Sequence, residues 1–297
     1  MPLRYISLFT GIGVGELAIS RIFPDAICLG YSEIDADANQ IYKHHYKNHL
    51  NLGDVCEIDG TQFAGQVDLI IGGSPCQAFS RKGKQAGFTD PRSRLFYHYK
   101  RILTETKARW FIFENVNSMK PEIRKTITQE LGVQPVIIDA CLFTPQVRRR
   151  AFWTNFPVPQ PEKQHNLQLR DILLPTTNMK DLSTNSVRGT TLQSLIQNGR
   201  ERDVFAITLV GAYSQGVKGR TDGKANTVTA ILNELQIVYD GTKFRRLDCV
   251  EAERLQGLPD DYTSMLPRVR RYKCIGNAFC LPVIVYLCEH LANAYYR

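Results

Sequence analysis

The chain has 297 residues, 43% of them hydrophobic, which is enough for a substantial core in one large domain or two. Its formal net charge of +8 favours a polyanionic partner, but charge carries no information about the fold. The eight cysteines are dispersed and form no Cys-x-x-Cys pair, which argues against a zinc or redox motif and is typical of a reducing, intracellular compartment. We find no signal-peptide pattern and no run of about 18 apolar residues, and therefore expect no membrane-spanning segment.

The chain begins with a predicted strand, a glycine-rich turn and a helix. The strand covers residues 5–9, the turn covers 10–15, and residues 16–22 have helical spacing. Glycines in such a turn let a ligand approach the backbone closely. Gly11 and Gly13 therefore indicate a nucleotide-binding segment.

A second predicted strand, residues 28–32, ends at Glu33, about 20 residues after the glycine turn. A carboxylate at this place can accept hydrogen bonds from ribose hydroxyls. The alternative is that Glu33 caps the helix predicted for residues 37–46. We favour the ribose interpretation.

Asp54 lies in the turn Gly53-Asp54-Val55, where we expect a third strand to have ended. Its carboxylate could accept a hydrogen bond from an adenine amino group. An ordinary Gly-Asp turn explains the same residues equally well.

A buried strand, residues 67–71, leads into the stretch around which the chain is organised. Gly72 and Gly73 break this strand, and Pro75 stiffens the turn that follows. Cys76 is thereby presented at the carboxyl end of a strand, where open α/β sheets place reactive groups. An ionised thiol is a strong nucleophile. The alternative is a structural cysteine buried beside a tight turn.

A basic loop follows this cysteine, and Leu95 then opens the next helix. The loop contains one acid, Asp90, against the cations Arg81, Lys82, Lys84, Arg92 and Arg94. Its glycines make it flexible. We interpret it as a lid that contacts phosphates, and a solvated surface loop is the alternative.

Two further strands lead to charged residues. The apolar run 110–113 ends at Glu114, which would lie beside Cys76 if the sheet is doubly wound. Another strand is expected at 136–140. Three arginines, residues 148–150, lie between a proline and the apolar run 151–154. Most arginine runs form a solvated face, and this enclosed position favours a functional role instead.

Between residues 156 and 244 the pattern changes to prolines and short strands. Strand candidates cover residues 205–210, 227–232 and 235–239, and residues 213–220 form a polar, glycine-rich loop with cations. Gln215 and Arg220 in this loop could read the edges of adenine and guanine. An ordinary β-rich loop is the alternative.

Taken in order, these segments resemble the motifs of the cytosine-5 DNA methyltransferase family. Eight stretches carry the resemblance: Phe9-x-Gly11-x-Gly13, Glu33, Asp54, Pro75-Cys76-Gln77, Glu114-Asn115-Val116, Gln146-x-Arg148-x-Arg150, residues 246–259, and Gly276-Asn277-Ala278-Phe279 with the helix after it. The resemblance covers residues 5–155 and 244–297. Val14 replaces the family's usual second adjacent glycine. Ser74 and the run 151–157 are more similar to the animal de novo branch.

The resemblance implies an α/β fold: a doubly wound, Rossmann-like methyltransferase sheet with a small, strand-rich target recognition domain inserted near the C-terminus. We expect residues 1–156 to form the catalytic domain that binds S-adenosylmethionine. Residues 157–243 should form the target recognition domain. Residues 244–297 should return to the catalytic domain, with a last helix beginning near Gly276.

The implied reaction transfers a methyl group to carbon 5 of a flipped-out cytosine in a short DNA sequence. The catalytic residues would be the nucleophile Cys76, the acid Glu114, and Arg148 and Arg150 at the carbonyl oxygen of the base. The resemblance assigns the donor to Phe9, Gly11, Gly13, Glu33, Ile34, Asp54, Val55, Pro75, Leu95 and Asn277. The expected DNA contacts are Ser80, Arg81, Lys82, Arg94, Gln215 and Arg220.

The methyl donor would be S-adenosylmethionine, the product S-adenosylhomocysteine, and no metal would be needed. The expected partners are double-stranded DNA, on which the chain would act as a monomer, and a cognate restriction endonuclease. No membrane partner is expected, and the location would be intracellular: cytoplasm or nucleoid, or the nucleus of a eukaryote. Two alternatives stay open, a cytosine-5 tRNA methyltransferase and a non-catalytic relative that binds DNA.

Overall fold

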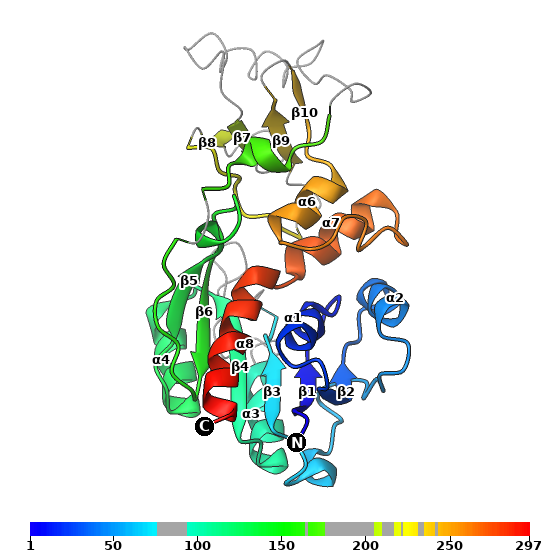
Figure 1. Ribbon diagram of the computed structural model, residues 1–297, viewed down its shortest axis with the longest axis vertical. Coiled ribbons are helices and arrows are strands. Elements are labelled where there is room, and N and C mark those ends of the chain that lie inside the picture. The colour runs from blue at the N-terminus through cyan, green and yellow to red at the C-terminus, as the bar shows by residue number, and fades with distance from the viewer. Residues whose placement is uncertain are drawn as a thin grey trace. The chain divides into compact units, whose positions relative to one another are not determined.

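The computed structural model describes residues 1–75, 94–163, 166–175, 205–209, 217–220, 222–230, 235–240 and 243–297. Contacts within the chain divide it into two compact units. The first unit comprises Met1–Asp139, Arg149–Pro161 and Leu281–Arg297, and the second comprises Ala140–Arg148 and Glu162–Cys280. Figure 1 labels their elements along the chain.

These units differ from the predicted segments at both junctions. Residues 244–280 were expected to return to the catalytic domain, but they pack within the second unit. The reason is that strand β10, Phe244–Arg246, pairs with a strand of the second unit's own sheet. Of the predicted C-terminal segment, only residues 281–297 belong to the first unit. They contain helix α8, Leu281–Tyr295, which begins five residues after the predicted Gly276.

The first unit is built on a six-stranded sheet with the order β2-β1-β3-β4-β6-β5. Its strands are β1 Arg4–Leu8, β2 Ile27–Ser32, β3 Leu69–Gly72, β4 Trp110–Val116, β5 Val136–Asp139 and β6 Arg149–Thr154. β1 pairs in parallel with β2 and β3, and β3 with β4, whereas β6 is antiparallel to both neighbours. From β1 the chain first adds β2 on one side, and then adds β3 and β4 on the other side of β1. This confirms the predicted doubly wound α/β sheet.

Helices cover both faces of this sheet. They are α1 Val14–Ile22, α2 Ala36–His45, α3 Leu95–Thr106, α4 Pro121–Leu131 and α8. Apolar side chains of α3 and α4 share one core with alternate residues of the strands, such as Ile6, Ile70 and Phe113. Ile71 points to the opposite face, where Gly15 of α1 comes close to it. The α1 helix also packs against α8.

Two expected strands do not form in the described residues. Before Gly53 the chain makes only one isolated bridge, between Tyr31 and Asn51. The Leu52 side chain packs closely over Gly30: a Cβ atom on Gly30 would lie 2.7 Å from Cγ of Leu52. Residues 222–230 likewise contain one bridge, between Gln146 and Ala225, in place of the predicted strand at 227–232.

The second unit contains a four-stranded antiparallel sheet with the order β10-β9-β7-β8. β7 Phe205–Leu209 and β9 Leu235–Tyr239 confirm two predicted strands, and β8 covers Val217–Arg220. Helices α6 Cys249–Leu255 and α7 Arg268–Asn277 follow. A capping box begins α6, because Asp248 and Glu251 exchange side-chain and backbone hydrogen bonds.

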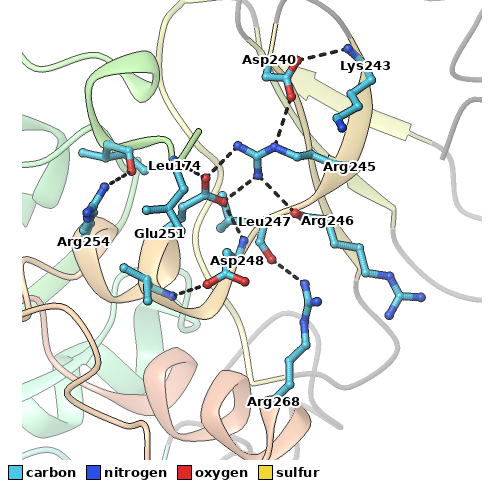
Figure 2. A network of polar contacts seen from close by, with 12 residues as sticks. Leu174, Asp240, Lys243, Arg245, Arg246, Leu247, Asp248, Glu251, Arg254 and Arg268 are labelled. Atoms are coloured by element: carbon cyan, nitrogen blue, oxygen red, sulfur yellow. Dashed lines mark hydrogen bonds and ion pairs between the residues drawn. The ribbon is translucent and has the colours of Figure 1, made fainter. Parts of the chain in front are cut away.

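A buried ion-pair network joins β10 to α6 (Figure 2). Arg245, only 1% exposed, donates from both terminal nitrogens to the two oxygens of Glu251 at 2.7 and 2.8 Å. Its Nε donates to Asp240 at 3.2 Å. The Glu251 oxygens also accept from the backbone N–H groups of Leu174 and Asp248. Every carboxylate oxygen of Glu251 therefore has partners, as a buried charge requires.

One stretch, Arg268–Tyr295, is long and apolar enough by composition to cross a membrane, but 67% of its most apolar window is buried within the protein. Burial of this kind is expected of core helices. The cysteines within the described ranges are all free thiols.

Candidate active site

Four segments of the first unit reach the same edge of its sheet. β1, β2, β3 and β4 are parallel, so their carboxyl ends lie together. The glycine turn follows β1, Glu33 follows β2, Ser74 and Pro75 follow β3, and Glu114 lies near the end of β4. The strand order reverses between β1 and β3, and open α/β sheets bind ligands at such a switch point.

The glycine turn requires glycine at two of its positions. Gly11 and Gly13 have φ angles of 62° and 85°, in the left-handed region that disfavours other residues. A Cβ on Gly13 would also lie 2.5 Å from the ring of Tyr46. Phe9 has a φ of 53° as well. Val14, in place of the second glycine, is buried as the first residue of α1, and so does not prevent the turn.

Glu33 connects this turn to the segment after β2. One carboxylate oxygen accepts from Gly11 N at 2.8 Å, and the other accepts from the N–H groups of Ile34 and Asp35, also at 2.8 Å. The N-cap of α2 is Asp35, whose side chain accepts from Asp37 N and Ala38 N. Glu33 is therefore not the cap residue. Ile34 is 71% exposed beside it, an unusual place for an isoleucine.

Asp54 lies in a turn that is tied to β2. Gly53 has a φ of 80°, and its carbonyl accepts from the Ser32 hydroxyl at 2.7 Å. The Asp54 side chain accepts from Cys56 N at 2.9 Å, which closes a local turn. Val55 is buried in the core shared with α3. The adenine contact of Asp54 stays a prediction.

The turn after β3 is held from β4. The Asn115 amide, fully buried, donates to the carbonyl and hydroxyl oxygens of Ser74 at 3.2 and 3.3 Å. Pro75 follows and is exposed. Cys76, Ser80, Arg81 and Lys82 lie outside the described residues. The structure therefore describes the base of the predicted nucleophile turn and the residue that supports it.

Glu114 and Arg150 form an ion pair with 2.9 Å between Oε1 and Nε. Glu114 is paired with Phe152 in the β4–β6 ladder, so Arg150 is its diagonal neighbour on the same face. Their side chains are 15% and 17% exposed, which leaves both within reach of a ligand. Two residues predicted to act together are therefore in direct contact.

Arg148 lies in the other unit from Arg150. It is 4% exposed, and its guanidinium donates to the carbonyl oxygens of Val228, Gly276 and Ala278 at 2.8 to 3.1 Å. This arrangement uses Arg148 to support the main chain of the second unit. It does not test the predicted contact with a cytosine, which stays a prediction.

The remaining predicted residues are dispersed. Arg94 is the exposed N-cap of α3, and Leu95 is its half-buried first residue. Asn277 is the exposed last residue of α7. Arg220 ends β8, whereas Gln215 lies outside the described residues. Among the residues that are described, no group of His, Cys, Asp and Glu is placed to hold a metal ion.

Supporting residues around these strand ends were missed from the sequence. Asn39, Tyr42 and Tyr46 contact the glycine turn or the Glu33 segment, and Asn115 holds Ser74. The spacing of three and then four residues between Asn39, Tyr42 and Tyr46 places them on one helix face. That spacing was the available signal.

Comparison with known proteins agrees with this geometry. The family model of C-5 cytosine-specific DNA methylases matches residues 3–293, and the chain therefore belongs to that family. It is 29% identical to the Type II methyltransferase M.NlaX of Neisseria lactamica, over 98% of this chain and 96% of the relative. It is also 29% identical to the Type II methyltransferase M.HhaI of Haemophilus parahaemolyticus, over 98% and 95%. The protein is thus a DNA (cytosine-5-)-methyltransferase by family.

Solved structures agree on the fold. The Entamoeba histolytica methyltransferase EhMeth superposes with a TM-score of 0.72 at 18% identity, covering 99% of both chains. The Dnmt2 methyltransferase of S. pombe superposes with a TM-score of 0.65, also at 18% identity, covering 99% of both chains.

Proposed function

We propose that this protein methylates carbon 5 of a cytosine in duplex DNA, with S-adenosylmethionine as donor and Cys76 as nucleophile. The observation that carries the proposal is the meeting of the glycine turn, Glu33 and the Ser74–Pro75 turn at the switch point of the sheet. Membership of the methylase family supports the same reaction.

The residues at these strand ends fit an adenosine group. A carboxylate offers about four acceptor sites, and Glu33 uses three for backbone N–H groups, so it can still accept from a ribose hydroxyl. The space where a Gly11 side chain would lie is open, with no atom within 4 Å. Ile34 presents an exposed apolar surface to a base, and Asp54 an acceptor to its amino group. When bound, the donor supplies an electrophilic methyl group.

The protein's own residues activate the cytosine. The Cys76 thiolate forms a bond to carbon 6, and the resulting enamine accepts the methyl group at carbon 5. A base then removes the carbon 5 proton, the bond from sulfur to carbon 6 breaks, and the thiolate leaves. Glu114 hydrogen-bonds ring N3 and the exocyclic amine, and Arg150, already paired with Glu114, lies beside the carbonyl oxygen of the base.

DNA recognition completes the proposal. The target atom is inaccessible inside a duplex, so the cytosine must be flipped out, at a cost of a few kcal/mol. Phosphate contacts from Ser80, Arg81, Lys82 and Arg94 would offset this cost. Gln215 and Arg220 would read base edges. The chain would act inside the cell as a monomer on DNA, alongside a cognate restriction endonuclease of the kind that the Type II names of its relatives suggest.

The test is methyl transfer with labelled donor to duplex DNA and, separately, to tRNA, followed by bisulfite sequencing. We expect incorporation into DNA at one short sequence. Cys76→Ala should reduce transfer to background and retain donor binding. DNA containing 5-fluorocytosine should trap the wild-type protein covalently, because the proton normally lost is absent. Transfer by Cys76→Ala at the wild-type rate would refute the nucleophile, and labelling of tRNA alone would favour an RNA methyltransferase.

A further inference from the structure

Helix α2 presents one polar face to the strand-end site. Asn39 and Tyr42 lie in α2 and Tyr46 is its C-cap residue, and intervals of three and four residues bring such side chains to one side of a helix. Asn39 and Tyr46 hydrogen-bond segments that carry predicted donor contacts, and Tyr42 hydrogen-bonds Glu16 in the helix that follows the glycine turn. None of these three residues is itself a predicted contact.

Tyr46 holds the glycine turn. Its hydroxyl donates to the carbonyl oxygen of Gly13 at 3.1 Å, and its ring fills the space that a side chain on Gly13 would need. The ring is fixed in turn: it stacks on His49 at 5.3 Å and 15°, and lies 5.0 Å from the Tyr42 ring. The Gly13 carbonyl and the φ of 85° at that residue are therefore set by Tyr46 from outside the turn.

Tyr42 holds the start of α1. It is fully buried, and its hydroxyl lies 3.1 Å from Oε1 of Glu16 and 2.9 Å from Nδ1 of His49. Glu16 is in the first turn of α1, directly after Gly13, where a carboxyl group also suits the helix dipole. A hydroxyl that donates to Glu16 can accept from a protonated His49 Nδ1, which gives a continuous chain of hydrogen bonds.

Asn39 holds the other half of the site. Its amide nitrogen donates to the carbonyl oxygens of Glu33 at 2.8 Å and Asp35 at 3.2 Å. Its amide oxygen accepts from Tyr31 at 3.2 Å and Asn51 at 2.9 Å. The Asn39 amide nitrogen therefore fixes the segment that carries Glu33 and Ile34, and the amide oxygen connects Asn39 to β2 and to the turn before Gly53.

We infer that Asn39, Tyr42 and Tyr46 are positioning residues for the methyl donor: they hold the glycine turn and the Glu33 segment in the geometry that the donor needs. The inference rests on the proposed function. Its physical basis is preorganisation, because a ligand that meets a fixed site does not have to order two flexible segments on binding. The bond between Glu33 and Gly11 N joins the two halves directly, and the α2 face fixes each half from behind.

Tyr46→Phe tests the inference, because it removes one hydroxyl and keeps the ring. Tyr286→Phe is the matched control: the Tyr286 hydroxyl also donates to a backbone carbonyl, Pro159 O, at 3.1 Å in the same unit. Donor and S-adenosylhomocysteine affinity are measured by calorimetry on the full chain. The KM for donor, the KM for DNA, kcat and the melting temperature are measured in parallel.

We expect Tyr46→Phe to raise the Kd and KM for the donor about 2- to 10-fold, the effect of one hydrogen bond. Saturating kcat and the KM for DNA should not change. Asn39→Ala should raise the same two donor constants. Tyr286→Phe should leave donor affinity at the wild-type value, whatever its effect on melting temperature.

Equal donor affinity in Tyr46→Phe, Asn39→Ala and the wild type would overturn the inference and leave the proposed function intact. A rise in donor Kd as large in Tyr286→Phe as in Tyr46→Phe would also overturn it, since that result reports general loosening of the unit. A wild-type protein that binds neither S-adenosylmethionine nor S-adenosylhomocysteine would refute the proposed function, and the inference with it.

Discussion

At the strand ends of the first unit, the chain is held by backbone N–H groups, a tyrosine hydroxyl and asparagine side chains. In the part of the chain that the structure describes, the Glu33 carboxylate accepts from three backbone N–H groups, and Tyr46 and Asn39 donate to carbonyls. At the junction of β10 and α6 in the second unit, the fixed groups are instead buried ions, Arg245 and Glu251, with Asp240 beside them (Figure 2). Both regions are polar, but the strand ends are partly exposed, with Ile34 71% exposed, whereas Arg245 and Glu251 are buried.

The difference reflects what each region has to do. The three backbone N–H contacts of the Glu33 carboxylate leave one acceptor site for a hydrogen bond from a ligand. In the second unit the Arg245 guanidinium is paired with two carboxylates, those of Glu251 and Asp240. Burial alone would lower the pKa of the Arg245 guanidinium, but the hydrogen bonds and charges of Glu251 and Asp240 raise it on balance. Such a network tolerates little rearrangement, because a misplaced partner leaves a charge buried and unpaired.

Loss of stability should be largest when this network is broken. Glu251→Ala leaves Arg245 with Asp240 as its one carboxylate partner among the described residues, at an expected cost of about 3–5 kcal/mol. The measurement is urea unfolding followed by circular dichroism. The control is Asp260→Ala, which removes an exposed ion pair with Arg254 and should cost about 0–1 kcal/mol. Equal losses in the two variants would show that burial does not govern the network.

Among the described residues of the first unit, Glu16 is the one carboxylic acid that is fully buried, and its effect on stability should depend on pH. One of its oxygens has no hydrogen-bond partner among the described residues, and burial raises the pKa of its carboxyl group from 4.5 to about 7. The folded protein therefore holds the proton more tightly than the unfolded chain. The stability contributed by Glu16 is complete below about pH 4.5 and is lost as the pH rises through 7.

Glu16→Gln should remove this loss and keep an acceptor for Tyr42. Relative to wild type, the variant should gain about 3 kcal/mol between pH 4.5 and pH 8, as the pKa change predicts. Unfolding free energies at the two pH values give the difference. Glu122→Gln, at an exposed position in the first turn of α4, serves as the control. A parallel pH profile for Glu16→Gln and wild type would contradict the prediction.

Donor affinity should depend on the Glu33 carboxylate and not on a carboxylate that caps a helix elsewhere in the first unit. Glu33→Ala should weaken donor binding by about 1–3 kcal/mol, the cost of losing a charged hydrogen bond. Asp59→Ala removes a side chain that caps the short helix Gly60–Phe63 and should leave donor affinity unchanged. Calorimetric titration measures both. Unchanged donor affinity in Glu33→Ala would mean that the Glu33 carboxylate does not contact the donor and serves only to hold the glycine turn.

A comparable free-energy change, confined to one base position of the site, should alter the sequence preference. Gln215→Ala and Arg220→Ala should relax the methylated sequence at one base position by about 1–3 kcal/mol. Lys82→Ala and Arg94→Ala should weaken binding to all DNA alike and reduce its salt dependence. Bisulfite sequencing of a random-sequence pool, with binding at several salt concentrations, distinguishes the two. If Gln215→Ala and Arg220→Ala lose activity uniformly across sites, base reading lies elsewhere.

Much of the first unit follows from the sequence because its signals are local. Apolar runs that end in glycine or a carboxylate predicted β1 to β4 and the residues at their carboxyl ends, and the order of the motifs predicted the doubly wound sheet. The family resemblance assigned Glu114 and Arg150 to the same cytosine, and the structure shows the two side chains paired.

The rest depended on contacts between residues far apart in the chain. Only the fold showed that Asp35 rather than Glu33 caps α2, that Arg148 supports carbonyls some 80 to 130 residues away, and that residues 244–280 pack with the second unit. The sequence pattern marks Tyr46 as one more aromatic residue at a helix end. Its bond to Gly13 exists because packing brings α2 against the glycine turn, and no local propensity encodes that distance.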